Sequence, residues 1–331
     1  MTILALETSC DDTCAAVVTA SGEILANVVS SQGVHDRFGG VVPELASRHH
    51  LELVNAVVDD ALARAGTGLD ELDAVAVTQG PGLVGALLVG VATAKGLAAA
   101  RRLPLIPVDH LQGHVAANFL APEPMEPPFV CLIASGGHTL LTRVHDHRGY
   151  EVAGGTLDDA AGEAFDKGAR LLGLGFPGGP ALSRLAAHGD PHAFAFPTAA
   201  KVAGLDFSFA GLKTALLYKV RDLGEEEAAR RAADLAASYE HAIVEALMAR
   251  VERALAAEPA PRLAIGGGVA ANRRLRARAE ALGVEVRVPP PALCTDNAAM
   301  IASAARWLEA VPYPHYLGLD AYATRPRSRA A

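Results

Sequence analysis

The chain of 331 residues has few cysteines, and they are not spaced for metal or disulfide chemistry. The four cysteines lack Cys-x-x-Cys spacing, so neither a zinc ribbon nor a disulfide framework is indicated. They are Cys10, Cys14, Cys131 and Cys294. Such sparse cysteine usage is typical of a reducing compartment, and we expect a cytoplasmic protein.

The sequence also lacks a recognisable signal peptide or membrane span. Met1 to Glu7 contains no basic n-region and reaches a carboxylate too early for a signal peptide. The most apolar run, Leu83 to Ala94, is shorter than the ~20 residues that a membrane-spanning helix requires. We therefore expect no membrane partner, and we predict that this run is a buried helix.

Positive charge is in deficit, with 29 Lys and Arg against 37 Asp and Glu and a formal charge of −8. This balance argues against a general nucleic-acid binder but leaves local basic patches open. Arginines cluster in three places, each of which is either a local basic patch or simply a solvated helix face or a disordered end. The clusters are Arg101 with Arg102, Arg273 and Arg274 with Arg276 and Arg278, and the tail residues Arg325, Arg327 and Arg329.

What the sequence does contain is ample apolar material. Hydrophobic residues make up 51% of the chain and charged residues 20%, which predicts a globular protein. The length favours about two domains. The longest predicted helix, residues 225–257, carries its charge mostly on one face, as a solvated surface helix does.

Two histidines four residues apart, His110 and His114, follow a predicted strand at residues 105–108. On a helix this spacing stacks both imidazoles on one face, where they can bind a single ion. A second pair, His188 and His192, is interrupted by Gly and Pro, which predicts a loop. Spacing alone leaves open that the first pair is an ordinary pair of histidines without a metal.

A pattern of strand, polar turn and strand occurs twice, at residues 3–18 and 130–144. In the first copy, turn hydroxyls could hold a phosphate, while Asp11 and Asp12 could hold a cation or accept a proton; an ordinary hairpin is the alternative. Four prolines at residues 122–128 indicate a domain junction between the copies. The repeat predicts a duplicated α/β architecture with a ligand in the cleft between its halves.

A third glycine-rich turn, Gly266 to Gly268, links a strand to a helix that begins near Asn272. Its glycines could admit a base or ribose close to the backbone. Asp166, in a helix predicted at residues 156–167, could bind a ligand hydroxyl or be a simple exposed carboxylate. Asp296 could supply the carboxylate that a site with two histidines lacks, or cap the last helix, or do both.

The motifs that carry a family resemblance cover nearly the whole chain. They are Glu7–Thr13, Gly39–Arg48, Gln79–Leu83, His110 with His114, Ser135–His138, Gly162–Lys167, Phe207–Lys213, Gly266–Asn272 and Cys294–Asn297. Together they resemble the TsaD family of tRNA threonylcarbamoyl transferases, long described as O-sialoglycoprotein endopeptidases. Ser183 and Ala210 depart from residues that are common in relatives, so no contact is transferred to either.

The resemblance implies an actin-like ATPase (ASKHA) fold, an α/β architecture with two RNase H-like domains around a nucleotide cleft. Residues 1–124 would form the N-terminal half, with the C-terminal segment 296–331 packing back on it. Residues 125–295 would form the C-terminal half.

The resemblance also implies the site residues. His110, His114 and Asp296 would bind one Fe²⁺ or Zn²⁺ per chain. The adenylate part of the substrate would be bound by Ile133, Ala134, Ser135, Gly136, Gly137, Asp166, Gly179 and Asn272. Among the carboxylates of the first turn, we take Asp11 as the candidate catalytic residue.

The implied reaction moves the threonylcarbamoyl group from threonylcarbamoyl-AMP to a tRNA. The acceptor would be the exocyclic amine of the adenosine 3′ of the anticodon, in tRNAs that read codons beginning with A. Family members work with TsaB-like and TsaE-like proteins, which are therefore expected partners.

Three other functions fit part of the pattern. A zinc peptidase could use the same histidines, but Leu111 stands where His-Glu-x-x-His proteases have their general base. An actin-like ATPase or sugar kinase shares the glycine-rich turns, although kinases hold Mg²⁺ on carboxylates and water rather than on imidazole. A nucleotide-gated subunit of an assembly, without enzymatic activity of its own, is the third.

Overall fold

The structure is a computed structural model, and it describes residues 1–38, 40–175, 177–198 and 202–324. The basic tail residues Arg325, Arg327 and Arg329 lie outside the described residues. The chain divides into two compact units. Unit 1 comprises Met1–Pro127, Asp146–Gly149 and Asp296–Ala331, and unit 2 comprises Pro128–His145 and Tyr150–Thr295. The domain boundaries inferred from the sequence, 1–124 with 296–331 and 125–295, remain a prediction.

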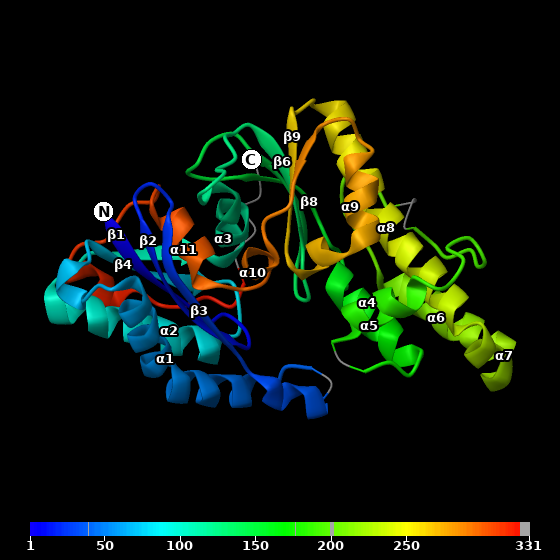
Figure 1. The fold of residues 1–331 in the computed structure, drawn as a ribbon, viewed down its shortest axis with the longest axis horizontal. Coiled ribbons are helices and arrows are strands. Elements are labelled where there is room, and N and C mark those ends of the chain that lie inside the picture. Colours follow the sequence, from blue (N-terminus) through cyan, green and yellow to red (C-terminus); the bar gives the residue numbers. More distant parts are fainter. Residues whose placement is uncertain (39, 176, 199–201, 325–331) are drawn as a thin grey trace. The chain divides into compact units, whose positions relative to one another are not determined.

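Unit 1 contains a five-stranded mixed sheet in the order β3-β2-β1-β4-β5 (Figure 1). β1 pairs antiparallel with β2, and β2 with β3, whereas β1, β4 and β5 run parallel. Parallel neighbours end at the same edge of a sheet, so the residues that follow β1, β4 and β5 lie together. The strands are β1 (Thr2–Glu7), β2 (Asp12–Thr19), β3 (Ile24–Ser31), β4 (Ala74–Gly80) and β5 (Leu105–Asp109).

Two long helices, α1 (Pro43–Ala65) and α2 (Val84–Arg101), pack against each other and against one face of this sheet (Figure 1). Two short helices, α3 (His110–Ala116) and α11 (Ala298–Ala305), also pack against each other, and α11 contacts β1 and β2. Gly66 ends α1 in the left-handed conformation, with φ of 65°, which glycine adopts without strain.

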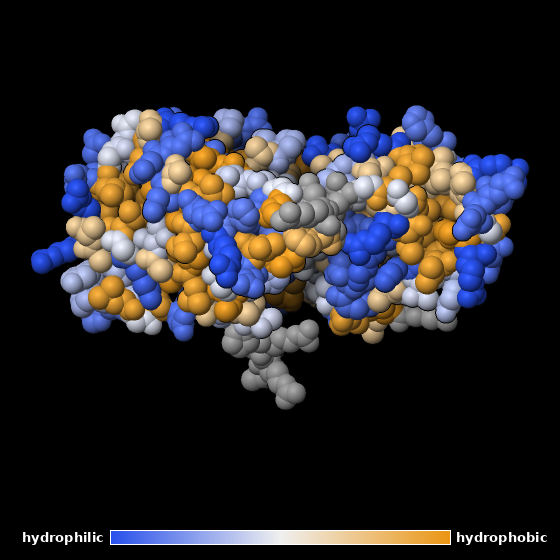
Figure 2. Space-filling view, turned by 90° about the horizontal axis from the view of Figure 1, so that it is seen from below, coloured by the Kyte–Doolittle hydropathy of each residue, from blue (hydrophilic) through white to orange (hydrophobic). Residues whose placement is uncertain are grey.

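The apolar helix predicted near Leu83 is α2. Among the described residues, it is the one helix long and apolar enough to cross a membrane, a test that core helices also pass. Its residues Leu87, Val91 and Ala94 are buried, while Val84 and Leu88 are 46% and 44% exposed. The prediction of a buried helix is therefore right for one face of α2. Apolar side chains are ordinary on protein surfaces, and Figure 2 shows hydrophobic and hydrophilic residues interspersed on one face.

Unit 2 contains a second five-stranded sheet, in the order β10-β9-β6-β7-β8. β6 pairs antiparallel with β7, and β7 with β8, whereas β6, β9 and β10 run parallel. This is the strand arrangement of unit 1, as the repeated pattern of strand, turn and strand predicts. The strands are β6 (Phe129–Ala134), β7 (Thr139–Val144), β8 (Glu151–Gly155), β9 (Arg262–Gly266) and β10 (Glu285–Arg287).

Five of the helices described in unit 2, α4, α5, α6, α7 and α9, pack against one long, largely buried helix, α8. The helices described in this unit are α4 (Ala161–Leu171), α5 (Gly178–Ala186), α6 (Ala210–Leu223), α7 (Glu225–Arg230), α8 (Ala232–Ala257), α9 (Arg273–Glu280) and α10 (Pro291–Cys294). Short 3₁₀ turns also occur in both units, at η1 (Gly33–Phe38), η2 (Leu69–Glu71), η3 (Ala117–Phe119), η4 (Gly268–Ala271) and η5 (His315–Gly318).

Two helix predictions for unit 2 are wrong in part. The helix predicted at 156–167 begins only at Ala161, because Thr156 Oγ1 donates to the carbonyl of Asp159 at 2.6 Å and holds a turn there. The helix predicted at 225–257 is interrupted between α7 and α8. Nor is α8 a solvated surface helix: it packs against α4, α5 and β6, and even its Glu240 and Arg250 are buried.

Candidate functional site

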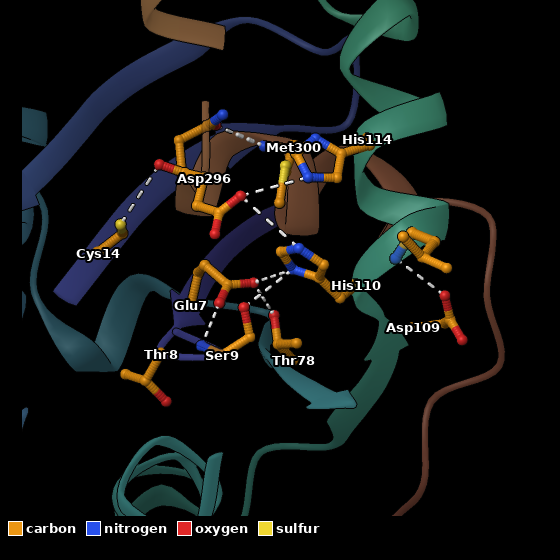
Figure 3. Close-up of polar contacts among 12 residues, drawn as sticks. Glu7, Thr8, Ser9, Cys14, Thr78, Asp109, His110, His114, Asp296 and Met300 are labelled. Carbon is orange, nitrogen blue, oxygen red and sulfur yellow. Dashed lines mark hydrogen bonds and ion pairs between the residues drawn. The ribbon is translucent and has the colours of Figure 1, made fainter. Parts of the chain in front are cut away.

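The two histidines come from the helix that follows β5 (Figure 3). Asp109 caps this helix, because its Oδ1 accepts the N–H groups of Leu111 at 2.9 Å and Gln112 at 3.1 Å. His110 and His114 then project from one face of α3, with ring centroids 4.8 Å apart and ring planes at 81°. The helical pair that the spacing predicted is therefore present.

Asp296 comes close to the histidines because α11 packs tightly on α3. A Cβ on Gly113 would lie 2.7 Å from Ile301 Cδ1, so the absence of a side chain at Gly113 lets the two helices approach. Ser303 Oγ donates to the carbonyl of Ala116 at 2.7 Å and provides a second link between these helices. The short helix α11 thus carries the preceding residue, Asp296, to α3.

The cap of α11 is Asn297, so the alternative interpretation of Asp296 as the cap is wrong. Asn297 Oδ1 accepts the N–H of Met300 at 3.0 Å. The carboxylate of Asp296 instead points to the histidines, with Oδ1 3.6 Å from His110 Nε2 and 3.3 Å from His114 Nε2 (Figure 3). One ligand atom from each of these three residues lies within 4.8 Å of the others.

The surroundings of His114 fit a metal ion. His114 is 1% exposed, and neither ring nitrogen has a hydrogen-bond partner among the described residues, since the 3.3 Å approach of Nε2 to Asp296 lacks hydrogen-bond geometry. A buried polar atom without a partner costs about 1–3 kcal/mol. Coordination would satisfy one nitrogen, and two imidazoles with one carboxylate suit a divalent transition metal.

A buried carboxylate that the sequence did not single out for this site lies behind His110. Glu7, the last residue of β1, is fully buried. Its Oε2 lies 3.0 Å from His110 Nδ1 and accepts the hydroxyl of Thr78 at 2.5 Å, and its Oε1 accepts the N–H of Ser9. Ser9 Oγ also lies 3.1 Å from His110 Nδ1. The sequence feature that could have identified Glu7 is its position as an acidic residue at the end of an apolar strand.

Burial and neighbouring charges act in opposite directions on the pKa values of this pair. Burial by itself lowers the pKa of His110, but the carboxylates of Glu7 and Asp296 outweigh it and raise that pKa to about 9. Burial raises the pKa of Glu7, yet the contact with His110 outweighs burial and lowers it below its ordinary value. A metal that binds Nε2 must therefore displace a proton from the pair.

Asp11, the candidate catalytic residue, lies in the turn between β1 and β2, and Asp12 is the first residue of β2. Asp11 is half-buried, and its carbonyl accepts the N–H of Gln32 at 3.2 Å. Burial raises the pKa of Asp12 to about 6, although a hydrogen bond with Ser31 opposes the shift. A carboxylate with a pKa near neutrality is suited to accept a proton, so Asp12 also meets a requirement of a general base.

The residues expected to bind adenylate in unit 2 include a turn at the end of β6. Ile133 and Ala134 end this strand, and Gly136 and Gly137 are exposed in the turn that follows, with nothing within 4 Å of a Cβ placed on either. Gly267, just after the parallel neighbour β9, has φ of +85°, and its Cβ would lie 2.3 Å from the Ala134 carbonyl oxygen. Glycine there brings two turns together and leaves open backbone that suits a phosphate or ribose.

Asp166 and Gly179 are brought together by a contact within the protein. Asp166 Oδ1 accepts the N–H groups of Gly178 at 2.8 Å and Gly179 at 3.2 Å, so it caps α5. Burial raises the pKa of Asp166, although these two bonds oppose it. Gly162, on the preceding turn of α4, donates its N–H to the carbonyl of Ser135 at 3.0 Å. Helix α4 therefore connects Asp166 to the exposed glycine turn.

Asn272 also uses its side chain within the protein. It caps α9, because its Oδ1 accepts the N–H of Leu275 at 2.9 Å. Its Nδ2 donates to Ser183 Oγ at 3.0 Å and to Glu240 Oε1 at 2.6 Å. Since Ser183 lies on α5, Asn272 belongs to the same cluster as Asp166.

Comparison with known sequences points to one family. The sequence model of the TsaD family, described as tRNA N6-adenosine threonylcarbamoyltransferase, matches residues 23–303. A protein of that description from Anaeromyxobacter dehalogenans (strain 2CP-1 / ATCC BAA-258) is 57% identical over 309 residues, which cover 91% of this chain and 92% of the relative. Another, from Symbiobacterium thermophilum, is 51% identical over 324 residues, which cover 96% of this chain and 95% of the relative.

Solved structures share the fold at low sequence identity. Full-length HypF in the phosphate- and nucleotide-bound form has a TM-score of 0.62 and 14% identity, covering 92% of this chain and 54% of that chain. Component A of the Acidaminococcus fermentans (R)-2-hydroxyglutaryl-CoA dehydratase has a TM-score of 0.55 and 14% identity, covering 92% and 95%. With the two equivalent sheets, these likenesses confirm the predicted actin-like fold class.

Proposed function

Because this chain belongs to the TsaD family of tRNA N6-adenosine threonylcarbamoyltransferases, we propose that it transfers threonylcarbamoyl from threonylcarbamoyl-AMP to tRNA. The acceptor is the exocyclic amine of the adenosine 3′ of the anticodon, in tRNAs that read codons beginning with A. The observation that carries the chemistry is the group formed by the buried His110 and His114 with the half-buried Asp296.

The reaction exchanges one bond at the carbamoyl carbon for another. A C–N bond forms between the adenosine amine and the carbonyl carbon, the C–O bond to the phosphate of AMP breaks, and the amine loses a proton. An aryl amine is a weak nucleophile, so the site must orient it and stabilise negative charge. A metal ion held by His110, His114 and Asp296 supplies, when bound, a Lewis acid for that charge.

The chain's own residues have three further tasks. Asp11, or its neighbour Asp12, accepts the proton of the amine. The turn Ile133 to Gly137, together with Asp166, Gly179 and Asn272, holds the adenylate. Backbone N–H groups at the open glycines are suited to bind its phosphate, and one such donor aimed at developing charge is worth about 3 kcal/mol, or about a hundredfold in rate.

The cofactor and partners follow from the same proposal. The ion is one Fe²⁺ or Zn²⁺ per chain, to which the donor set of two imidazoles and a carboxylate is suited. TsaB-like and TsaE-like proteins assist the turnover, and the reaction takes place in the cytoplasm, where tRNA is available.

The test is a transfer assay on the full chain with a TsaB-like partner. Threonylcarbamoyl-AMP labelled on threonine is incubated with an unmodified tRNA that reads a codon beginning with A, and the nucleosides are mapped. A matched tRNA with guanosine 3′ of the anticodon should remain unlabelled. Label on the matched tRNA, or release of AMP without any labelled nucleoside, would contradict the proposal. Parallel assays for ATP hydrolysis and for glycoprotein cleavage report on the two rival activities.

A further inference from the structure

In the part of the chain that the structure describes, only one of the two histidines has a carboxylate in contact with its Nδ1 atom. His110 Nδ1 faces the carboxylate of Glu7 at 3.0 Å, whereas His114 Nδ1 is buried without a hydrogen-bond partner among the described residues. The two rings are otherwise alike, since both project from α3 and both are at most 3% exposed. A neighbouring carboxylate therefore orients the ring of His110 toward a shared ion, whereas no comparable contact from the described ranges orients the ring of His114 (Figure 3).

Glu7 is itself held in place by donors from two other segments. Thr78, on β4, donates its hydroxyl to Oε2, and the N–H of Ser9, in the turn after β1, donates to Oε1. Because β1 and β4 are parallel neighbours, the sheet fixes the separation of Glu7 and Thr78. The carboxylate thus cannot turn away from His110 without leaving buried donors unsatisfied.

From this geometry we propose that Glu7 is the positioning residue of the metal group. Its Oε2 accepts the Nδ1 proton of His110, which leaves Nε2 as the atom that faces the ion. Glu7 also places a second carboxylate beside the group, in which Asp296 is the one carboxylate among the three candidate ligands. The inference rests on the proposed metal site and is independent of the acyl acceptor.

A metal-binding titration of the full chain tests this role directly. The protein is stripped with a chelator, and the affinity for Zn²⁺ is measured by competition with an indicator dye. Glu7→Gln keeps the shape of the side chain but removes the charge, and we expect its affinity to fall about 10–100-fold, the usual cost of losing such a partner of a ligating histidine. The visible spectrum of bound Co²⁺ should change as well, because the imidazole is less well oriented.

Matched variants separate Glu7 from its neighbours. Ser9→Ala removes the other oxygen near His110 Nδ1, and we expect it to change the affinity by less than about threefold, well below the loss for a partner of a ligating histidine. Wild-type affinity and an unchanged Co²⁺ spectrum in Glu7→Gln would overturn the proposal, as would a larger loss in Ser9→Ala than in Glu7→Gln. If Glu7→Gln does not fold, Glu7→Asp takes its place: it keeps the charge but is too short to reach Nδ1, so wild-type affinity would again overturn the proposal.

The titration also distinguishes this inference from the proposed function. No tRNA or adenylate is present, so a failure of threonylcarbamoyl transfer leaves the metal affinities of the variants unaffected. A wild-type chain that binds neither Zn²⁺ nor Co²⁺ would overturn the metal site and the role of Glu7 together.

Discussion

The candidate metal group of unit 1 and the candidate adenylate cluster of unit 2 differ in how their side chains are used. In unit 1, His114 has ring nitrogens without hydrogen-bond partners among the described residues, which suits it to bind an ion. In unit 2, Asp166 and Asn272 already cap α5 and α9. Substituting a histidine of the metal group therefore removes a candidate ligand, whereas substituting Asp166 or Asn272 also removes a helix cap. Loss of binding in unit 2 must be separated from loss of stability.

The largest expected effect is on metal content in unit 1. His110→Ala removes one of three ligands, and we expect the affinity for a divalent metal to fall by at least about a hundredfold, more than the loss of an outer partner causes. His188→Ala is the matched control, because His188 is exposed outside the cluster. Elemental analysis after dialysis should find the first variant empty and the second loaded. A fully loaded His110→Ala would place the metal elsewhere.

In unit 2, substitutions of Asn272 test whether this candidate binding residue also stabilises the fold. Asn272→Asp retains a helix cap but places a carboxylate where Nδ2 now lies 2.6 Å from Glu240 Oε1. We expect it to destabilise the fold by about 3 kcal/mol, more than Asn272→Ala, because two buried carboxylates would face each other. Urea unfolding of the three proteins gives the order. Equal stability of Asn272→Asp and the wild type would show that this contact is not important.

The contributions of Asp12 and Asp158 to folding stability are expected to change in opposite directions with pH. Burial raises the pKa of Asp12 in unit 1 to about 6, so its folded state holds a proton more tightly than the unfolded chain does. Its contribution to stability therefore falls as pH rises from about 4 to about 6, and Asp12→Asn should gain up to about 3 kcal/mol at pH 7 but nothing near pH 3.5.

Asp158 in unit 2 behaves in the opposite way. Burial works to raise its pKa, but hydrogen bonds from Ser208, Phe209 and Ala210 outweigh it and lower the pKa. The stability it contributes is present above the unfolded pKa of about 4 and is lost as pH falls through the lowered value. Asp158→Asn should then lose about 0.5–1 kcal/mol at pH 7, the range of a weakened helix cap. Unfolding curves of both variants in chelator, at pH 3.5 and 7, give the two signs, and parallel pH profiles would contradict this difference.

Removal of the cap at Asp166 is expected to have a smaller effect on stability than Asn272→Asp or Asp12→Asn. Asp166→Ala should lower stability by about 1 kcal/mol and weaken AMP binding, while Asp166→Asn keeps an oxygen acceptor for α5. Gly137→Val fills the open turn without touching a cap, so it should weaken AMP binding at nearly unchanged stability. Calorimetry with AMP, beside metal analysis, separates these effects. Wild-type AMP affinity in Asp166→Ala and Gly137→Val would remove both from the adenylate site.

The smallest effect concerns tRNA. Arg274 and Arg278 of α9 already pair with carboxylates of α8, whereas Arg273 is exposed. With a net charge of −8, the isolated chain should bind tRNA weakly, with a salt slope of only ~0.7–0.9 per phosphate contacted. Replacing Arg325, Arg327 and Arg329 by Gln should reduce transfer without changing AMP affinity, and Arg278→Gln should leave tRNA binding unchanged. Tight, steeply salt-dependent binding by the chain alone would contradict this electrostatic argument.

Predictions from sequence succeed here where they depend on local geometry. The family, the actin-like fold class and the transferase activity are confirmed, whereas the individual site residues remain predictions. The approach of His110 to His114 could be predicted because a helix places residues four apart on one face. The helix at 225–257 was misjudged because charge spacing does not reveal that a helix is covered by its neighbours on several sides, as α8 is.

Local sequence patterns were enough to predict the short-range units of this protein: the turns that need glycine, the helix that carries two histidines and the duplicated strand patterns. Which of these units contact one another depends on the tertiary structure. Glu7 reaches His110 across 103 residues of sequence, and Asn272 reaches Ser183 across 89. Such contacts depend on strand order and on the close packing of helices, as at Gly113, where the absence of a side chain lets α11 bring Asp296 to α3. Local residue preferences extend over only a few positions, so they could not specify these long-range contacts.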